Sequence, residues 1–140
     1  VMAAFGVAAS MESSPKLMTS VMASGFGLPK DVLQLRQDVT RPPPMEGKTV
    51  LVKTEACSLS PCDWRTLSGD NALVRTPVFP YIPGGDVCGT VVEPSPPFAV
   101  GEQVVATWGG LFPAGGLGEY AILDAKLTVR KPQDLTCVHA

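Results

Sequence analysis

The sequence has few of the residues from which metal sites are built, and it has no long apolar run. It contains one histidine, His139, and its four cysteines form no Cys-x-x-Cys pair. No apolar run approaches the roughly 20 residues that a membrane helix needs, so we expect no transmembrane segment. The net charge of −2 gives no electrostatic basis for binding nucleic acid or anionic lipid.

A dinucleotide-binding turn is also missing from the sequence. No Gly-x-Gly-x-x-Gly follows a predicted strand, and the glycine-rich segment 109–118 lies between two predicted strands without opening a helix. We interpret that segment as a flexible loop between strands. Without a strand–helix–strand unit, the pyrophosphate of a dinucleotide has no place to dock.

The composition indicates one globular domain with many turns. The chain has 140 residues, enough for one domain with a real core but too few for two ordinary ones. Glycine and proline, 14 of each, point to short strands. Residues 1–19 are either a flexible extension or the remnant of an organelle-targeting segment, although they lack arginine. The location stays open between the cytoplasm and an organelle (plastid or mitochondrion).

Short strands are expected throughout the folded part, residues 20–140. Segment 49–57 alternates, with Val50 and Val52 on one face and charged residues on the other, which predicts a half-buried strand. Strands this short, separated by turn residues, are typical of a small β-barrel. The other predicted strands are 20–27, 32–39, 84–93, 102–108, 118–124 and 127–129.

A short helix is expected after strand 49–57. Pro61 suits the first position of a helix, where its missing N–H has no partner to lose. The helix continues for about two turns, and Gly69 can end it in a left-handed cap. Residues 70–83 contain too many prolines and other turn residues for regular structure.

These elements carry three motifs that are specific in combination. They are Pro-Cys-Asp after the strand (61–63), PYIPGGD-x-x-G (80–89) and Gly-Glu-x-Val (101–104). With them the chain resembles the amino-terminal GroES-like domain of the medium-chain dehydrogenase/reductase superfamily, on its zinc-independent quinone-reductase side. The resemblance implies a mainly β fold: a partly open β-barrel with one or two short helices, lacking the Rossmann nucleotide-binding domain.

The same resemblance argues against zinc. It places Ser60, Gly85 and Asp86 where zinc-dependent relatives carry a cysteine, a histidine and a glutamate. A serine hydroxyl is a poor zinc ligand, and glycine has no side chain that could bind zinc. Cys62 lies two residues beyond the position of the ligand cysteine. We therefore expect no metal ion in this domain.

The resemblance maps the loop that faces the nicotinamide onto the residues around the helix start. Ser60, Asp63 and Arg65 become the catalytic candidates, and Ser60, Pro61 and Trp64 the cofactor-binding candidates. Ser60 would bind the substrate oxygen or the cofactor amide, and Arg65 would contact a phosphate or stabilise negative charge on oxygen. Each residue also has a structural interpretation: Asp63 capping the helix, Trp64 packing in the core or a domain interface, and Arg65 solvated.

Other side chains leave alternatives open. Asp86 is expected either to pair with Arg65 or Arg75 or to face solvent. The four cysteines (57, 62, 88 and 137) are expected to be small, mostly buried thiols in a reducing compartment, and no disulfide is specified by their spacing. Gly84, Gly85 and Gly89 predict a close approach of the strand to a neighbouring domain or cofactor.

Two departures from relatives bear on the substrate. Zinc-free quinone reductases usually carry asparagine where Ser60 stands. Enoyl-thioester reductases carry a tyrosine donor after the short helix, but residues 69–77 contain none, and we interpret Tyr81 and Tyr120 as scaffold. Quinones or enones are therefore favoured over enoyl thioesters.

Two functions follow from the resemblance. The chain is either the substrate-side domain of an NADPH-dependent quinone or enone reductase, inactive by itself, or a non-catalytic structural subunit derived from one and held in a larger complex. In both cases we expect an apolar face covered by a partner, which is the Rossmann domain in the first case and other subunits in the second.

Overall fold

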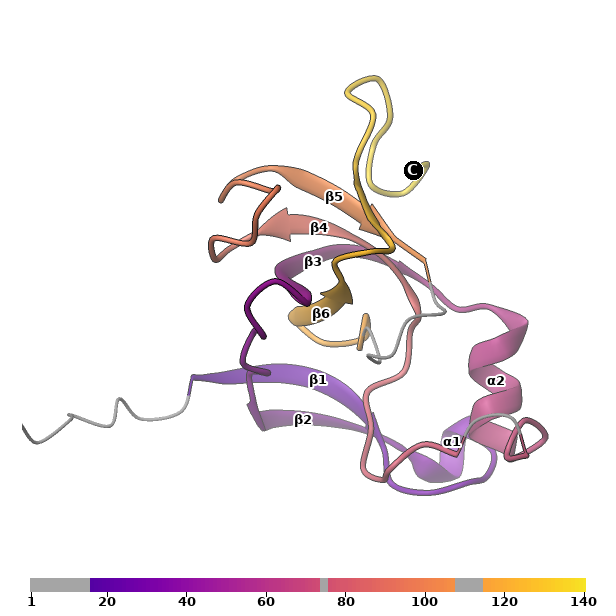
Figure 1. The fold of residues 1–140 in the computed structure, drawn as a ribbon. Helices are drawn as coiled ribbons and strands as arrows, with labels where there is room; N and C mark the ends of the chain where they lie inside the picture. The colour runs from indigo at the N-terminus through magenta and orange to yellow at the C-terminus, as the bar shows by residue number, and fades with distance from the viewer. Residues whose placement is uncertain (1–15, 74–75, 108–114) are drawn as a thin grey trace, which may run out of the picture.

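A curled five-stranded antiparallel sheet is the main body of the protein (Figure 1). The computed structural model describes residues 16–73, 76–107 and 115–140. The strand order is β6-β3-β4-β5-β7. The mainly β, partly open barrel expected from the sequence is confirmed. Its strands are β3 (Thr49–Ser58), β4 (Asp86–Val91), β5 (Gln103–Ala106), β6 (Tyr120–Asp124) and β7 (Thr128–Arg130).

A separate antiparallel hairpin packs beside this sheet. It consists of β1 (Leu17–Ala23) and β2 (Leu33–Thr40), with the one-turn helix α1 (Pro29–Val32) between them. The N–H of Val21 donates to the carbonyl of Leu117 at 2.9 Å, which joins β1 to the chain just before β6. Neither helix in the described ranges is long and apolar enough to cross a membrane.

Several element boundaries differ from the prediction. The first strand begins earlier, at Leu17, because its pairing with Thr40 extends the hairpin ladder. Helix α1 begins in the gap between the predicted strands 20–27 and 32–39, since the fixed φ of Pro29 suits a first helical turn. The strand predicted at 102–108 ends at Ala106, and Trp108 lies outside the described residues.

The prediction of a half-buried strand at 49–57 is right only for its second half. Val50 and Val52 belong to the main hydrophobic cluster, and Leu51, on the opposite face, is also fully buried. Leu51 pairs with Ile122 of β6, which is buried as well. Both faces of this part of β3 are therefore covered in the fold, a tertiary effect that alternation does not reveal.

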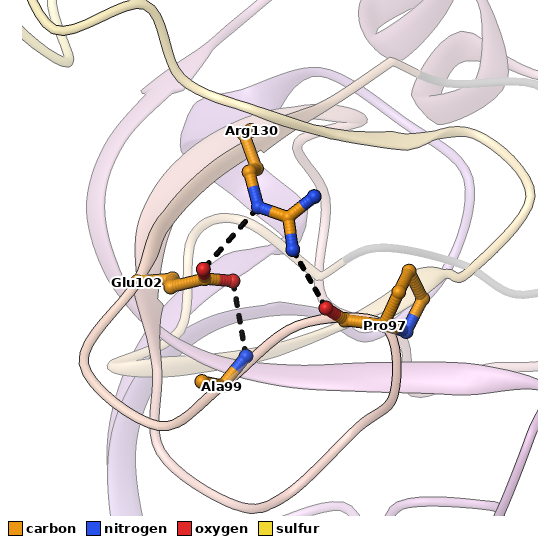
Figure 2. A network of polar contacts seen from close by, with 4 residues as sticks. All are labelled: Pro97, Ala99, Glu102 and Arg130. Atoms are coloured by element: carbon orange, nitrogen blue, oxygen red, sulfur yellow. Dashed lines mark hydrogen bonds and ion pairs between the residues drawn. The ribbon is translucent and has the colours of Figure 1, made fainter.

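A polar network fastens the turn between β4 and β5 to strand β7 (Figure 2). Glu102 accepts hydrogen bonds from the backbone N–H of Ala99 at 3.0 Å and from Arg130 Nε at 3.2 Å. Arg130 Nη2 also donates to the carbonyl of Pro97 at 2.7 Å. The Ala99 N–H, followed by Arg130, lowers the pKa of Glu102 from its ordinary value of 4.5.

This network predicts a pH-dependent contribution of Glu102 to stability. A carboxyl whose pKa is lowered by folding stabilises the protein above its unfolded pKa, and the contribution is lost as the pH falls through the folded value. We expect Glu102→Gln to lower the thermal unfolding midpoint at pH 7, and the difference from the unmodified protein to persist down to about pH 4.5 and to shrink as the pH falls further, through the lowered pKa of Glu102. Asp134→Asn, at an exposed carboxylate outside the network, is the control. A pH-independent difference would contradict this assignment.

Candidate functional site

The candidate site lies where β3 runs into helix α2 (Pro61–Ser68). Ser60 is the extended N-cap residue and Pro61 occupies the first helical position. Gly69 ends the helix in the left-handed region with φ of 90°, so the predicted helix and both of its ends are confirmed. Glycine reaches this φ without the steric conflict that other residues meet.

Asp63 fastens the helix start to the segment before β4. Its Oδ2 accepts hydrogen bonds from the backbone N–H of Ser60 at 2.8 Å and from Ser60 Oγ at 3.0 Å. Its Oδ1 accepts from the N–H of Gly84 at 3.2 Å. Both carboxylate oxygens therefore hold the loop in place, which is the bracing role that the sequence offered as an alternative to a reactive one.

The hydroxyl of Ser60 has a defined orientation. Because the Asp63 carboxylate can only accept, Ser60 Oγ donates its proton to Asp63. The capping box directs the Asp63 N–H to the same oxygen, which leaves one lone pair for a ligand. Ser60 is partly exposed. It can accept a hydrogen bond from an amide N–H, such as that of a nicotinamide carboxamide, but it cannot also donate to a substrate oxygen without leaving Asp63.

Trp64 and Arg65 are on the surface. The Trp64 side chain is 53% exposed, so the interpretation of core packing is wrong, and an interface or stacking role remains. The Arg65 guanidinium lies 5.5 Å from the centre of the Trp64 ring. The pair presents a cation beside an open aromatic face, next to the helix start that carries Ser60.

Asp86 is held by hydroxyl groups. Its carboxylate accepts hydrogen bonds from Ser58 Oγ and Thr107 Oγ1, each at 2.9 Å. An ion pair of this carboxylate with Arg65 or Arg75 was one expectation from the sequence. Arg75 lies outside the described residues. These contacts tie the end of β3 and the end of β5 to the start of β4.

A cavity of about 720 Å³ lies beside these strand ends. Its walls come from the ends of β3 and β5, the start of β4, and the carboxyl-terminal segment. We call it the strand-end cavity. The lining residues are Ala56, Cys57, Ser58, Asp86, Val87, Cys88, Val105, Ala106, Thr107, Leu127, Val129, Cys137, Val138 and Ala140.

Cys57 lines this cavity and contacts the candidate site. An added Cβ at Gly84, where φ is +95°, or at Gly116 would lie 2.4 Å from Cys57 Sγ. Burial, and then the charges of Asp63 and Asp86, raises the pKa of Cys57 to about 11. The thiol is therefore protonated near neutral pH and fills space as a packing group instead of acting as a nucleophile.

Gly84 and Gly89 approach neighbours within this domain closely, and the approach to a neighbouring domain or cofactor that the sequence predicted for Gly84, Gly85 and Gly89 stays a prediction. Gly84 accommodates Cys57, and an added Cβ at Gly89 would lie 2.4 Å from the carbonyl oxygen of Lys53 on β3. Pairing of β3 and β4 shifts its register at this point, between Thr54 and Ala56. The glycines thus serve the packing of the sheet and of the candidate site.

The expectation of four thiols is wrong for two of the cysteines. Cys88 and Cys137, 49 residues apart, form a disulfide, whereas Cys57 and Cys62 are free. The sequence did not indicate the bond because only the folded sheet brings the carboxyl-terminal segment back to β4. In the described parts of the chain, no three His, Cys, Asp or Glu side chains gather as metal ligands would.

The two tyrosines contact scaffold residues. The Tyr81 ring packs edge-on against Phe79, with centroids 5.5 Å apart, and Arg41 lies 5.2 Å from the centre of the Tyr120 ring. Tyr120 belongs to β6, and Tyr81 bridges to Ala23 of β1. These positions agree with the interpretation of both residues as scaffold.

Comparisons with known proteins point to one group of enzymes. Residues 46–133 match the model of the alcohol dehydrogenase GroES-like domain. The chain is 37% identical over 128 residues to the chloroplastic quinone-oxidoreductase QR1 of Triphysaria versicolor, an alignment that covers 89% of this chain and 38% of that protein. It is 36% identical over 131 residues to human quinone oxidoreductase, covering 89% and 37%.

Solved structures give the same result. A mycobacterial protein in complex with NADPH matches with a TM-score of 0.72 and 30% identity, covering 86% of this chain and 34% of that one. An alcohol dehydrogenase superfamily protein of Novosphingobium aromaticivorans matches with a TM-score of 0.71 and 32% identity, covering 86% and 36%. The chain spans less than two fifths of the length of the curated relatives that it matches.

Proposed function

Because the chain belongs to the alcohol dehydrogenase GroES-like domain family, on the zinc-independent quinone-oxidoreductase side of the medium-chain dehydrogenase/reductase superfamily, we propose that it is the substrate-side domain of an NADPH-dependent reductase. Its substrates are quinones or activated C=C bonds. The observation that carries this proposal is the Ser60 loop, which Asp63 holds against Gly84 with one Ser60 lone pair available to a ligand.

The described residues fit one end of the cofactor. Reduced nicotinamide, when bound, supplies the hydride. Ser60 Oγ suits the carboxamide N–H, and Pro61 and the open ring of Trp64 offer apolar surface beside it. The described ranges contain no glycine-rich turn that opens a helix, so nothing in them suits the pyrophosphate. The rest of the cofactor needs a second domain.

Arg65 supports the chemistry through its charge. It is exposed beside Trp64, five residues after Ser60 on the same helix. Negative charge develops on the substrate oxygen when a quinone or enone accepts hydride, and a nearby guanidinium stabilises such charge. The thiol of Cys57 and the carboxylate of Asp63 take no part in bond making, since both are held by packing or by hydrogen bonds.

The chain by itself is expected to be inactive. A homogeneous 140-residue preparation should oxidise NADPH with 1,4-benzoquinone no faster than buffer alone, because its sequence has no Gly-x-Gly-x-x-Gly after a predicted strand to hold the pyrophosphate. The intact mass of the protein from its native source should exceed 14.7 kDa by on the order of one further domain. A native mass of 14.7 kDa would instead favour the structural subunit, and NADPH consumption by the chain alone would refute the proposal.

Ser60 is the residue whose replacement tests the contact with the cofactor. In an active form that includes a nucleotide-binding domain, we expect Ser60→Ala to lower kcat/KM about five- to tenfold, the loss of one hydrogen bond of about 1 kcal/mol. Ser60→Asn should keep most of the activity, because the amide also accepts a hydrogen bond. Ser68→Ala, at the other end of α2, is the control. Equal rates for Ser60→Ala and Ser68→Ala would remove Ser60 from the site.

A further inference from the structure

The segment after β7 has few polar links to the rest of the domain. It rises beyond the sheet and folds back as a loop (Figure 1, yellow). The N–H of Lys131 donates to the carbonyl of Gln103 at 2.9 Å. Beyond it, the hydrogen bonds that the structure describes for residues 132–140 stay local, such as His139 N–H to the carbonyl of Thr136 at 3.0 Å. We call residues 132–140 the tail.

The disulfide is what connects the tail to the sheet. Cys88 lies in the middle of β4, is 4% exposed, and pairs with Ala56 of β3 and Val105 of β5. Its partner Cys137 is partly exposed within the tail. A buried cysteine in a paired strand is thus joined to a partly exposed one in a segment whose described hydrogen bonds are local.

The tail also forms part of the strand-end cavity. Cys137, Val138 and Ala140 line it opposite the strands. Cys57, which contacts the Gly84 side of the candidate site, lines the same cavity. The disulfide therefore joins one wall of this cavity, which adjoins the candidate site, to β4.

We propose that the Cys88–Cys137 disulfide is a redox-modifiable site that holds the tail against the sheet, and that a dithiol reductant releases the tail and opens the strand-end cavity. This inference does not depend on the proposed reductase function. It rests on the position of the two sulfurs, the local hydrogen bonding of the tail and the lining of the cavity.

The reaction is a two-electron thiol–disulfide exchange. A thiolate of the dithiol attacks the accessible sulfur of Cys137, forming a mixed disulfide and displacing the Cys88 thiolate, which takes up a proton. The second thiol of the reductant then displaces Cys137. The products are two protein thiols and the oxidised, cyclic disulfide of the reductant, so electrons and protons balance.

Cys57 does not attack the Cys88–Cys137 disulfide, although it lines the same cavity. Internal exchange requires a thiolate, and burial together with the charges of Asp63 and Asp86 keeps Cys57 protonated near neutral pH. The disulfide therefore persists until an external dithiol arrives. The pair Cys88 and Cys137 is expected to respond as a unit while Cys57 remains a packing group.

Thiol counting and hydrogen exchange test the proposal on the 140-residue chain. Air-purified protein should show two free thiols in denaturant, and four after treatment with dithiothreitol. Native-state exchange followed by mass spectrometry should then accelerate at least tenfold at the hydrogen-bonded amides of the tail, Leu135 and His139, after reduction, while the β3 and β4 amides stay protected. Four free thiols before reduction, or unchanged exchange in the tail, would overturn the proposal.

Two variants separate release of the tail from general loosening. Cys137→Ser removes the partly exposed partner and leaves the buried Cys88 in place, so the fold should persist with fast tail exchange whether or not dithiothreitol is added. Cys62→Ser, at a free cysteine outside the cavity, should respond to dithiothreitol as the unmodified chain does. If the tail of the Cys137→Ser protein exchanged as slowly as the tail of the oxidised protein, the disulfide would not be what holds the tail against the sheet.

Discussion

Gly116→Ala is expected to lower the free energy of unfolding by about 2–3 kcal/mol, within the range typical of overpacked interiors. The added Cβ would lie 2.4 Å from Cys57 Sγ, 2.8 Å from Val87 Cγ2 and 3.0 Å from Cys57 Cβ. Gly116 is buried and these neighbours belong to paired strands, so the clash has no easy relief. Urea denaturation followed by circular dichroism would measure the loss.

A double-mutant cycle identifies the cause of this loss. Cys57→Ala removes the sulfur that lies nearest the added methyl, so Gly116→Ala should cost at least 1 kcal/mol less in that background than in the unmodified chain. Gly25→Ala is the matched control, because an added Cβ there meets nothing within 4 Å. If Gly116→Ala were as mild as Gly25→Ala, the packing described around Cys57 would be wrong.

Asp63→Ala should cost a similar amount, about 2–3 kcal/mol. The substitution removes an acceptor of three hydrogen bonds and leaves the N–H groups of Ser60 and Gly84 without that partner. Bonds to charged groups contribute more than neutral ones, and loss of helix capping alone costs about 1 kcal/mol. The same urea experiment measures it.

The matched control for Asp63 is Asp70→Ala, an exposed aspartate just beyond the end of α2. Its removal should change the unfolding free energy by less than about 0.5 kcal/mol, as surface substitutions usually do. Asp63→Asn should fall between the two, because the amide keeps one acceptor oxygen and loses the charge. Equal stability of the Asp63→Ala and Asp70→Ala proteins would show that Asp63 does not brace the loop.

Local features of the fold could be predicted because local residues determine them. Pro61 and Gly69 mark the two ends of α2, and each acts through its own backbone geometry. The strands around Val50, Val87 and Ile122 were likewise evident from short apolar segments between turn residues. Their exact ends were not, since pairing partners far along the chain set where each ladder stops.

The arrangement of the site depended on contacts between distant segments. Nothing in the sequence joins Cys57 to Gly116, or Cys88 to Cys137, because those neighbours meet only through the curled sheet. Trp64 was placed in the core or an interface, but the face that an eight-residue helix buries follows from its packing. For Asp63 the capping position itself was the signal, and it pointed to the bracing role.

The proposed reductase role makes the second domain the missing part of the active site. Ser60, Pro61, Trp64 and Arg65 lie at one end of the molecule, where α2 leaves Trp64 open. A nucleotide-binding domain placed against that end would cover the exposed ring and bring a nicotinamide to Ser60. The lengths of the relatives are consistent with a second domain, since the quinone oxidoreductases that the chain matches are more than twice as long as this chain.

The most direct test is quinone reduction by a chimera. The segment of Triphysaria versicolor QR1 that aligns with this chain would be replaced by the chain, and oxidation of NADPH by 1,4-benzoquinone would be recorded for the chimera, for QR1 and for the 140-residue chain. The account predicts turnover by the chimera and none by the chain alone. A folded chimera that binds NADPH but leaves the quinone unreduced, while QR1 reduces it, would contradict the account.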